Sequence, residues 1–146
     1  IHTALEAAET GHIVFATLHT AGASSTINRV IDVFPKEQQD QIRTMLADAL
    51  IGVVSQMLCK KKSGGRTAAY EVLIINAAIS NLIREGKIFQ IPTMMQTGKA
   101  IGMKLMNDSL AELVEKGLVA ADEALSKAVD RDNLKNRLKA KNLISD

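Results

Sequence analysis

Two histidines stand at the two ends of a short apolar run, in the stretch "TGHIVFATLHTAGASSTINRV". The run Ile13–Leu18 is rich in strand-forming residues and predicts a strand buried on both faces, as in a parallel sheet. Ligands of α/β sheets bind beyond the carboxyl ends of such strands, which is where His19 falls. Thr17 and Thr20 place hydroxyls beside its imidazole. Because a neutral imidazole offers one donor and one acceptor and a hydroxyl offers both, this set could bind a phosphate oxygen or an ordered water.

His12 lies at the opposite end of the predicted strand, about 20 Å of backbone from His19. The two rings therefore cannot share a small metal ion within one chain. The alternative for either histidine is a hydrogen-bonded packing residue, which is a common role for a histidine at a strand end. No carboxylate pair, Ser-His-Asp order or Cys-His arrangement accompanies them, and we expect no metal site.

A basic segment, "CKKKSGGR", follows later in the chain. It lacks the G-x-x-x-x-G-K-[ST] order of a phosphate-binding loop, so we expect a hairpin turn at Ser63–Gly65. Lys60–Lys62 are expected to be the solvated end of a strand and not a nucleic-acid patch. Arg66, next to the turn, could point at a ligand or at a neighbouring subunit, and the sequence leaves both open.

The composition argues against several classes of protein. The chain has 146 residues, 47% of them hydrophobic, which is enough for one compact domain with a core. A net charge of +2 and only 3% aromatic residues argue against nucleic acid as a partner. No apolar run approaches the roughly 20 residues of a membrane span, and the single cysteine, Cys59, permits no internal disulfide. We expect a cytoplasmic protein and, because Ile1 stands inside what looks like the end of a helix, a fragment of a longer one.

The elements that would position the histidines lie in the first half of the chain. Helical spacing predicts a helix ending at Gly11, and a second helix that Ser24 or Ser25 caps and Pro35 stops. The clearest periodicity predicts one long helix over residues 37–58. That helix is expected to lead directly into the β-hairpin.

The second half is expected to be helical. Asn76 is a predicted N-cap of a short helix closed by Gly86, and Pro92 fits the first turn of the next helix. Two more helices follow, one stopped by Gly117 and one over residues 121–129. The charged C-terminal end is expected to fray.

Motifs in a fixed order indicate a resemblance to a known family. They are "AAETGHIVFATLHTAGASSTINRVIDVFP", "RTMLADAL", "GGRTAAYEVLI", "AISNLIREGKI", "MQTG" and "LAELVEKGLV". In this order and with these spacings they resemble the C-terminal part of PilT-type ATPases, the type IV pilus retraction motors of twitching motility within the secretion-ATPase superfamily. The resemblance covers nearly the whole chain and weakens after about Asp130.

The resemblance implies an α/β fold in two portions. Residues 1–76 would be part of a RecA-like P-loop NTPase domain with few strands and a β-hairpin, and residues 77–146 a mainly helical C-terminal region. It also implies a homo-hexamer that binds ATP and Mg²⁺ and uses hydrolysis to retract pili, in contact with an inner-membrane pilus platform protein. Such a protein is cytoplasmic and peripheral at the inner membrane of bacteria, without crossing it.

The stretch "TGHIVFATLHT" is similar to the family's His box. The resemblance implies that His19 and Thr17 are catalytic residues near the γ-phosphate, while His12 lies nearer to a subunit or domain contact. The other candidates for nucleotide-binding or His-box residues are Thr10, Thr20 and Arg66. One charge-assisted hydrogen bond of about 1.5–3 kcal/mol, if made only in the transition state, would change the rate roughly ten- to a hundredfold.

The stretch "AISNLIRE" is similar to the family's "AIRNLIRE" retraction motif. Ser80 replaces the first arginine of that motif, which puts in question any polar contact that the arginine makes. The other motif residues carried onto this chain are Ala78, Ile79, Asn81, Leu82, Ile83, Arg84 and Glu85.

The resemblance also bears on activity and subfamily. The family's Walker A loop, Walker B acid and arginine fingers would lie before Ile1, so this chain alone is not expected to hydrolyse ATP. Type II secretion ATPases usually carry a four-cysteine zinc insertion, whereas this chain has Cys59 alone, which favours a retraction motor. The alternatives are a fragment of a type II secretion or pilus assembly ATPase, and a non-catalytic helical interaction module.

Overall fold

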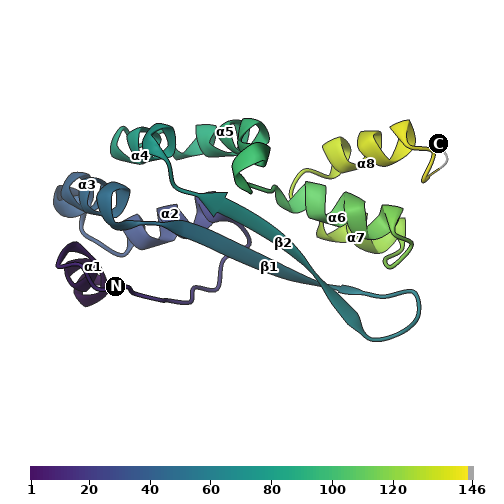
Figure 1. The fold of residues 1–146 in the computed structure, drawn as a ribbon, viewed down its shortest axis with the longest axis horizontal. Coiled ribbons are helices and arrows are strands. Elements are labelled where there is room, and N and C mark those ends of the chain that lie inside the picture. The colour runs from purple at the N-terminus through teal and green to yellow at the C-terminus, as the bar shows by residue number, and fades with distance from the viewer. Residues whose placement is uncertain (145–146) are drawn as a thin grey trace.

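A long β-hairpin is the only sheet in the part of the chain that the structure describes, residues 1–144 of a computed structural model. Strands β1 (Gly52–Lys60) and β2 (Arg66–Ile74) pair antiparallel along their whole length. Gly64 and Gly65 in the connecting turn have φ angles of +89° and +74°, a conformation that favours glycine. The predicted hairpin and its Ser-Gly-Gly turn are confirmed, and the turn projects at one end of the molecule (Figure 1).

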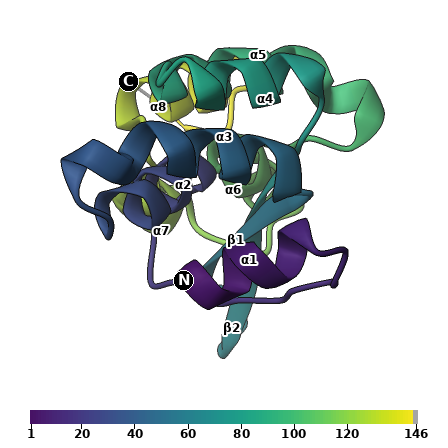
Figure 2. The same cartoon turned by 90° about the vertical axis from the view of Figure 1, so that its left-hand side faces the viewer.

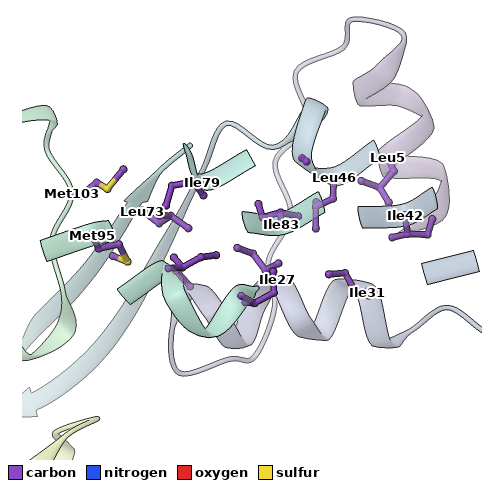
Figure 3. Packing of buried hydrophobic residues seen from close by; sticks show 14 of the residues in the cluster. Leu5, Ile27, Ile31, Ile42, Leu46, Leu73, Ile79, Ile83, Met95 and Met103 are labelled. Atoms are coloured by element: carbon purple, nitrogen blue, oxygen red, sulfur yellow. The ribbon is translucent and has the colours of Figure 1, made fainter. Parts of the chain in front are cut away.

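Helices α1 to α5 surround the base of the hairpin, where β1 begins and β2 ends (Figures 1 and 2). Their apolar sides form a first core. Figure 3 shows Ile27, Leu73 and Ile83 in this core, each at most 1% exposed. The helices are α1 (His2–Glu9), α2 (Ala23–Asp32), α3 (Gln39–Ala49), α4 (Ala77–Arg84) and α5 (Ile91–Thr97), with the 3₁₀ turns η1 (Lys36–Gln38), η2 (Ile88–Gln90) and η3 (Gly98–Ile101).

A second core lies beside the half of the hairpin that leads to its turn. Helices α6 (Met106–Glu115), α7 (Ala121–Lys127) and α8 (Arg131–Ala140) meet there, at the C-terminal side of the molecule in Figure 1. The hairpin contributes Cys59 and Ala69, both fully buried. The two strands therefore join two cores, one built with α1–α5 and the other with α6–α8.

The chain before α6 runs along the edge of β2. The N–H of Val72 donates to the carbonyl of Lys104 at 2.8 Å, and the N–H of Lys104 donates back to Val72 at 2.9 Å. The N–H of Tyr70 donates to Ser109 Oγ at 2.9 Å. These bonds occupy the backbone groups that an edge strand otherwise offers to another strand.

Several predicted helix ends are confirmed. Asn76 caps α4, because its Oδ1 accepts the N–H of Ile79 at 3.0 Å. Helix α1 ends before Gly11, α6 ends before Gly117, and Pro92 lies in the first turn of α5. An α/β chain with a hairpin and a mainly helical remainder is therefore confirmed.

The strand predicted at Ile13–Leu18 is wrong for the described structure. Residues 12–20 are extended but pair with no described strand. Ile13 is 76% exposed and Phe15 is 95% exposed. A strand buried on both faces requires neighbouring strands and covering layers, and the two strands of the hairpin pair with each other instead.

The long helix predicted over residues 37–58 is also wrong in its second half. Helix α3 ends at Ala49, and β1 begins at Gly52. The apolar residues beyond Ala49 fit a strand as well as a helix, because every second residue from Val53 to Cys59 lies on the covered face of β1. Pairing with β2 decides between the two periods.

Fraying is expected for residues 130–146, but residues 131–140 form α8, and residues 145–146 lie outside the described part of the chain. Asp130 caps this helix, since its Oδ1 accepts the N–H of Asn133 at 2.9 Å. Leu134 and Leu138, one turn apart, are fully buried in the second core. Two leucines on one side of this otherwise polar helix dock it on the second core, and the ion pair between Arg137 and Asp108 adds a polar contact to α6.

Candidate functional site

His12 is held at the end of α1. Its Nδ1 lies 3.1 Å from Thr10 Oγ1 and 3.2 Å from the carbonyl oxygen of Ala7. The hydroxyl of Thr10 also donates to the Ala7 carbonyl, at 2.9 Å. The structure thus brings Thr10 and His12 together at the carbonyl of Ala7 in the last helical turn, which also accepts the backbone N–H of His12 at 3.1 Å.

The segment after His12 presents its side chains to solvent. Thr17 and His19 are both exposed. Neither side chain makes a hydrogen bond or ion pair with another residue of the described chain. Their hydroxyl and imidazole groups are therefore accessible to a ligand or to another part of the protein.

Thr20 ties the end of this segment to α2. Its Oγ1 lies 2.6 Å from Thr26 Oγ1, and the Thr26 hydroxyl donates to the carbonyl of Gly22 at 2.8 Å. Because the one Thr26 hydroxyl proton is used in that bond, Thr20 is the donor in the other. Two hydroxyls thus close the turn that follows His19.

The N-terminus of α2 is held by Glu71 of β2, a residue that sequence reasoning missed. The predicted caps Ser24 and Ser25 are wrong, because Gly22 occupies the N-cap position and Glu71 Oε1 accepts the N–H of Ala23 at 2.7 Å. One signal was available in the sequence: Glu71 is the single acid in the strand "AAYEVLI". The two-residue period of a strand places it on the covered face, where it is 8% exposed.

Arg66 lies away from this turn, at the end of β2 next to the hairpin turn. Arg66 is five positions before Glu71 along the strand, a separation of about 17 Å. Figure 1 shows the hairpin turn, which Arg66 directly follows, at the opposite end of the hairpin from α1 and α2, the helices that flank the segment of His19. Arg66 instead lines a groove between the hairpin and α7, together with Gln56, Met57, Leu58, Lys60, Glu123 and Lys127.

Helix α4 carries the motif residues in two groups. Ile79 and Ile83 are fully buried in the first core, and Leu82 packs against it. Ala78, Asn81, Arg84 and Glu85 are exposed. The motif thus uses one side to dock on the core and leaves the other side accessible.

The polar residues of α4 bind it to α3 and to each other. The hydroxyl of Ser80 donates to the carbonyl of Ala47 at 2.8 Å. Arg84 forms an ion pair with Asp48 of α3, and its guanidinium also donates to Asn81 Oδ1 at 2.9 Å. Ser80 therefore has a defined partner in place of any contact made by an arginine at this position.

The site fits a nucleotide only in part. The exposed imidazole of His19 and hydroxyl of Thr17 are suited to phosphate oxygens. Residues 12–22 contain no carboxylate, the side chain that Mg²⁺ prefers, and residues 1–144 contain no cluster of three or more His, Cys, Asp or Glu side chains that could hold a metal ion. No helix within the same described range is long and apolar enough to cross a membrane.

Comparison with known proteins supports the resemblance that the motifs indicate. The family described as "Type II/IV secretion system protein" matches residues 1–63. A "Twitching motility protein" of Neisseria gonorrhoeae is 49% identical, over 92% of this chain and 36% of its own length. The type IV pilus retraction ATPase PilT of Pseudomonas aeruginosa is 50% identical, over 91% of this chain and 39% of its own length.

A solved structure agrees with the sequence comparison. The crystal structure of the pilus retraction motor PilT with bound ADP superposes on 92% of this chain with a TM-score of 0.84 and 46% identity. The chain is therefore similar to part of a PilT-type protein. This PilT-like chain covers 38% of the solved motor and 36% to 39% of the two relatives named above.

Proposed function

We propose that this PilT-like chain belongs to a hexameric ATPase motor that hydrolyses ATP, with Mg²⁺, to drive type IV pilus retraction. In this proposal residues 1–76 are part of the RecA-like ATPase core and residues 77–146 are the helical C-terminal region. The motor acts on the cytoplasmic side of the inner membrane, against a pilus platform protein. Its support is the 46% identity and 0.84 TM-score shared with a retraction motor that was solved with ADP.

The observation that carries the proposal is the exposed segment that ends at a closed turn. Thr17 and His19 have accessible polar groups, while Thr20 is tied to α2. A turn held by the hydrogen bond between Thr20 and Thr26, next to accessible polar groups, suits phosphoryl transfer. In that reaction, positioning and charge stabilisation matter more than covalent chemistry. We assign the γ-phosphate contact to His19 and Thr17.

The remaining candidates receive supporting roles. Thr20 sets the turn, and the pair Thr10 and His12 lies at the end of α1, where a neighbouring subunit or domain could contact it. Arg66, remote from His19 within the chain, is assigned to a nucleotide or subunit contact made from the hairpin side.

The test is the ATP turnover of the full-length protein with His19→Ala. The rate should fall roughly ten- to a hundredfold, the effect of one charge-assisted hydrogen bond made in the transition state. His2→Ala is a matched control, because His2 is an exposed histidine of α1 whose ring contacts Glu6 at 3.2 Å. Undiminished turnover with His19→Ala would remove this residue from the site.

A second role, force coupling by α4, is favoured by the exposed side of the motif. Ala78, Asn81 and Glu85 are spaced to lie on one side of the helix, and all three are exposed. Asn81→Ala with Glu85→Ala should abolish retraction while ATP binding persists. Ile83→Ala is the contrasting variant, since Ile83 is fully buried and its loss should impair folding and both activities together.

Retraction and assembly motors are distinguished by the phenotype of cells that lack the gene. Loss of a retraction motor should leave cells piliated but unable to twitch. Loss of an assembly motor should leave them without surface pili, and that result would favour the assembly alternative.

A further inference from the structure

One buried carboxylate joins two helices that are far apart in the sequence. Glu71 Oε1 accepts the N–H of Ala23, the first residue of α2, at 2.7 Å. Glu71 Oε2 accepts the N–H of Met106, the first residue of α6, at 3.1 Å. The side chain therefore uses both oxygens, one on each helix.

This arrangement compensates for burying the carboxylate. Glu71 is only 8% exposed, and a buried carboxylate is costly unless hydrogen-bond donors replace the lost water. Two helix N-termini supply such donors together with their partial positive charge. Helix α2 has no acidic residue in its first turn, so Glu71 provides the anion there.

Gly22 makes the close approach possible. A Cβ at Gly22 would lie 3.0 Å from Glu71 Oε1, tighter than ordinary contacts. Ser55, directly opposite Glu71 in the hairpin, is also small and buried. The surroundings of the carboxylate are therefore shaped to admit it between β2 and the start of α2.

The turn held by Glu71 is the one that follows His19. Ala23 is four residues after His19, and the bonds of Thr20 and Thr26 close the backbone between them. Glu71 of β2 therefore fixes the position of the backbone turn at which the exposed segment joins α2. Because Glu71 also accepts the N–H of Met106, the same carboxylate holds the first residue of α6.

We propose that Glu71 is a positioning residue for His19. The Glu71 carboxylate orients the turn at residues 20–23 and holds it at a fixed position relative to the start of α6. It acts through backbone N–H groups and does not touch the nucleotide. The inference rests on the proposed ATPase function. It predicts that disturbing Glu71 slows turnover more than it weakens ATP binding.

The test is Glu71→Gln in the full-length protein, because glutamine keeps the shape but turns one acceptor oxygen into an NH₂ donor. The kcat for ATP should fall about tenfold while KM changes less than about twofold. Amide hydrogen exchange at Ala23 or Met106 should accelerate about tenfold. Ser109→Ala is the matched control, since it removes a bond between α6 and β2 beside Glu71 and should leave kcat within about twofold.

Two results would overturn the inference. One is a Glu71→Gln protein with wild-type kcat, and the other is an equal loss of kcat in Ser109→Ala, which would mean that any loosening of α6 has the same effect. If Glu71→Gln does not fold, Glu71→Asp is the second variant. It keeps the charge with a shorter side chain and should give a smaller loss of kcat. A folded Glu71→Asp protein with wild-type kcat would equally contradict the proposal.

The failure of this inference can be distinguished from failure of the proposed function. If His19→Ala reduces turnover and Glu71→Gln does not, only this inference is overturned. A wild-type protein without ATPase activity would overturn the proposed function as well.

Discussion

Ser80 donates its hydroxyl to the backbone carbonyl of Ala47 at 2.8 Å, and this bond joins α4 to α3. The residue that replaces the first arginine of the motif thus takes part in docking the motif helix. Arg84 and Asp48 form an ion pair between the same two helices. Helix α4 is therefore held by apolar packing on one side and by two polar contacts to α3.

Ser80→Ala should lower the free energy of unfolding by about 1 kcal/mol, because it removes a bond and leaves the Ala47 carbonyl without this donor. Chemical denaturation of the protein would measure it. Ser63→Ala, in the exposed hairpin turn, is the control and should change the free energy by less than about 0.5 kcal/mol. Equal stability of the two variants would show that the Ser80 bond contributes nothing.

Asp108 makes stability depend on pH. Burial favours the neutral acid, but hydrogen bonds and ion pairs from Arg137 and Lys99 outweigh it and hold the pKa of Asp108 below its ordinary value. A lowered folded pKa stabilises the protein above the unfolded pKa of about 3.9, and that stabilisation is lost as the pH falls through the folded pKa.

Asp108→Asn should therefore cost about 1.5–3 kcal/mol near neutral pH and progressively less below about pH 4. Thermal unfolding across this range would show the two proteins converging in acid. Asp32→Asn, at an exposed position at the end of α2, is the control and should change the free energy of unfolding by less than about 0.5 kcal/mol. A stability difference for Asp108→Asn that stays constant with pH would contradict the assigned ion pairs.

Cys59, the one cysteine of the chain, reports on opening of the second core. Burial raises the pKa of its thiol, the nearby Glu123 raises it further, and Lys127 partly opposes both. Because the thiolate is the reactive form, the folded protein should react with a thiol reagent at least about 100-fold more slowly than the unfolded protein. Lys127→Gln should slow the reaction further, and rapid labelling of the folded wild type would mean that this core is open to solvent.

Leu134→Ala should destabilise the protein by about 2–5 kcal/mol, since the side chain is fully buried in the second core. Val129→Ala is a matched control: Val129 is 69% exposed and should matter by less than about 0.5 kcal/mol. Calorimetry or denaturant titration would measure both. A small effect of Leu134→Ala would support the fraying that the charged sequence suggested.

Local signals predicted much of the fold because they act within a few residues. The cap at Asn76, the helix end before Gly117 and the Ser-Gly-Gly hairpin turn each depend on the backbone preferences or hydrogen bonds of neighbouring residues. The motif order likewise needs no three-dimensional information. It was enough to relate the chain to PilT-like proteins.

Other features could not be read locally because distant partners decide them. The residues after Ala49 satisfied both a helical and a strand period, and pairing with β2 selected the strand. Ile13–Leu18 had the composition of a buried strand, but no described strand lies against it. Leu134 and Leu138 docked a helix that its charge alone would have left to fray.

By itself, the sequence indicated the resemblance to PilT-type proteins, most helix ends and the hairpin turn. Only the tertiary structure decided that Glu71 joins α2 to α6, that Ser80 bonds to α3, and that Arg66 stands apart from His19 within the chain. The reason is physical: a helix cap or turn depends on adjacent backbone, whereas a buried carboxylate or hydroxyl is satisfied by whichever donor or acceptor packing brings within about 3 Å.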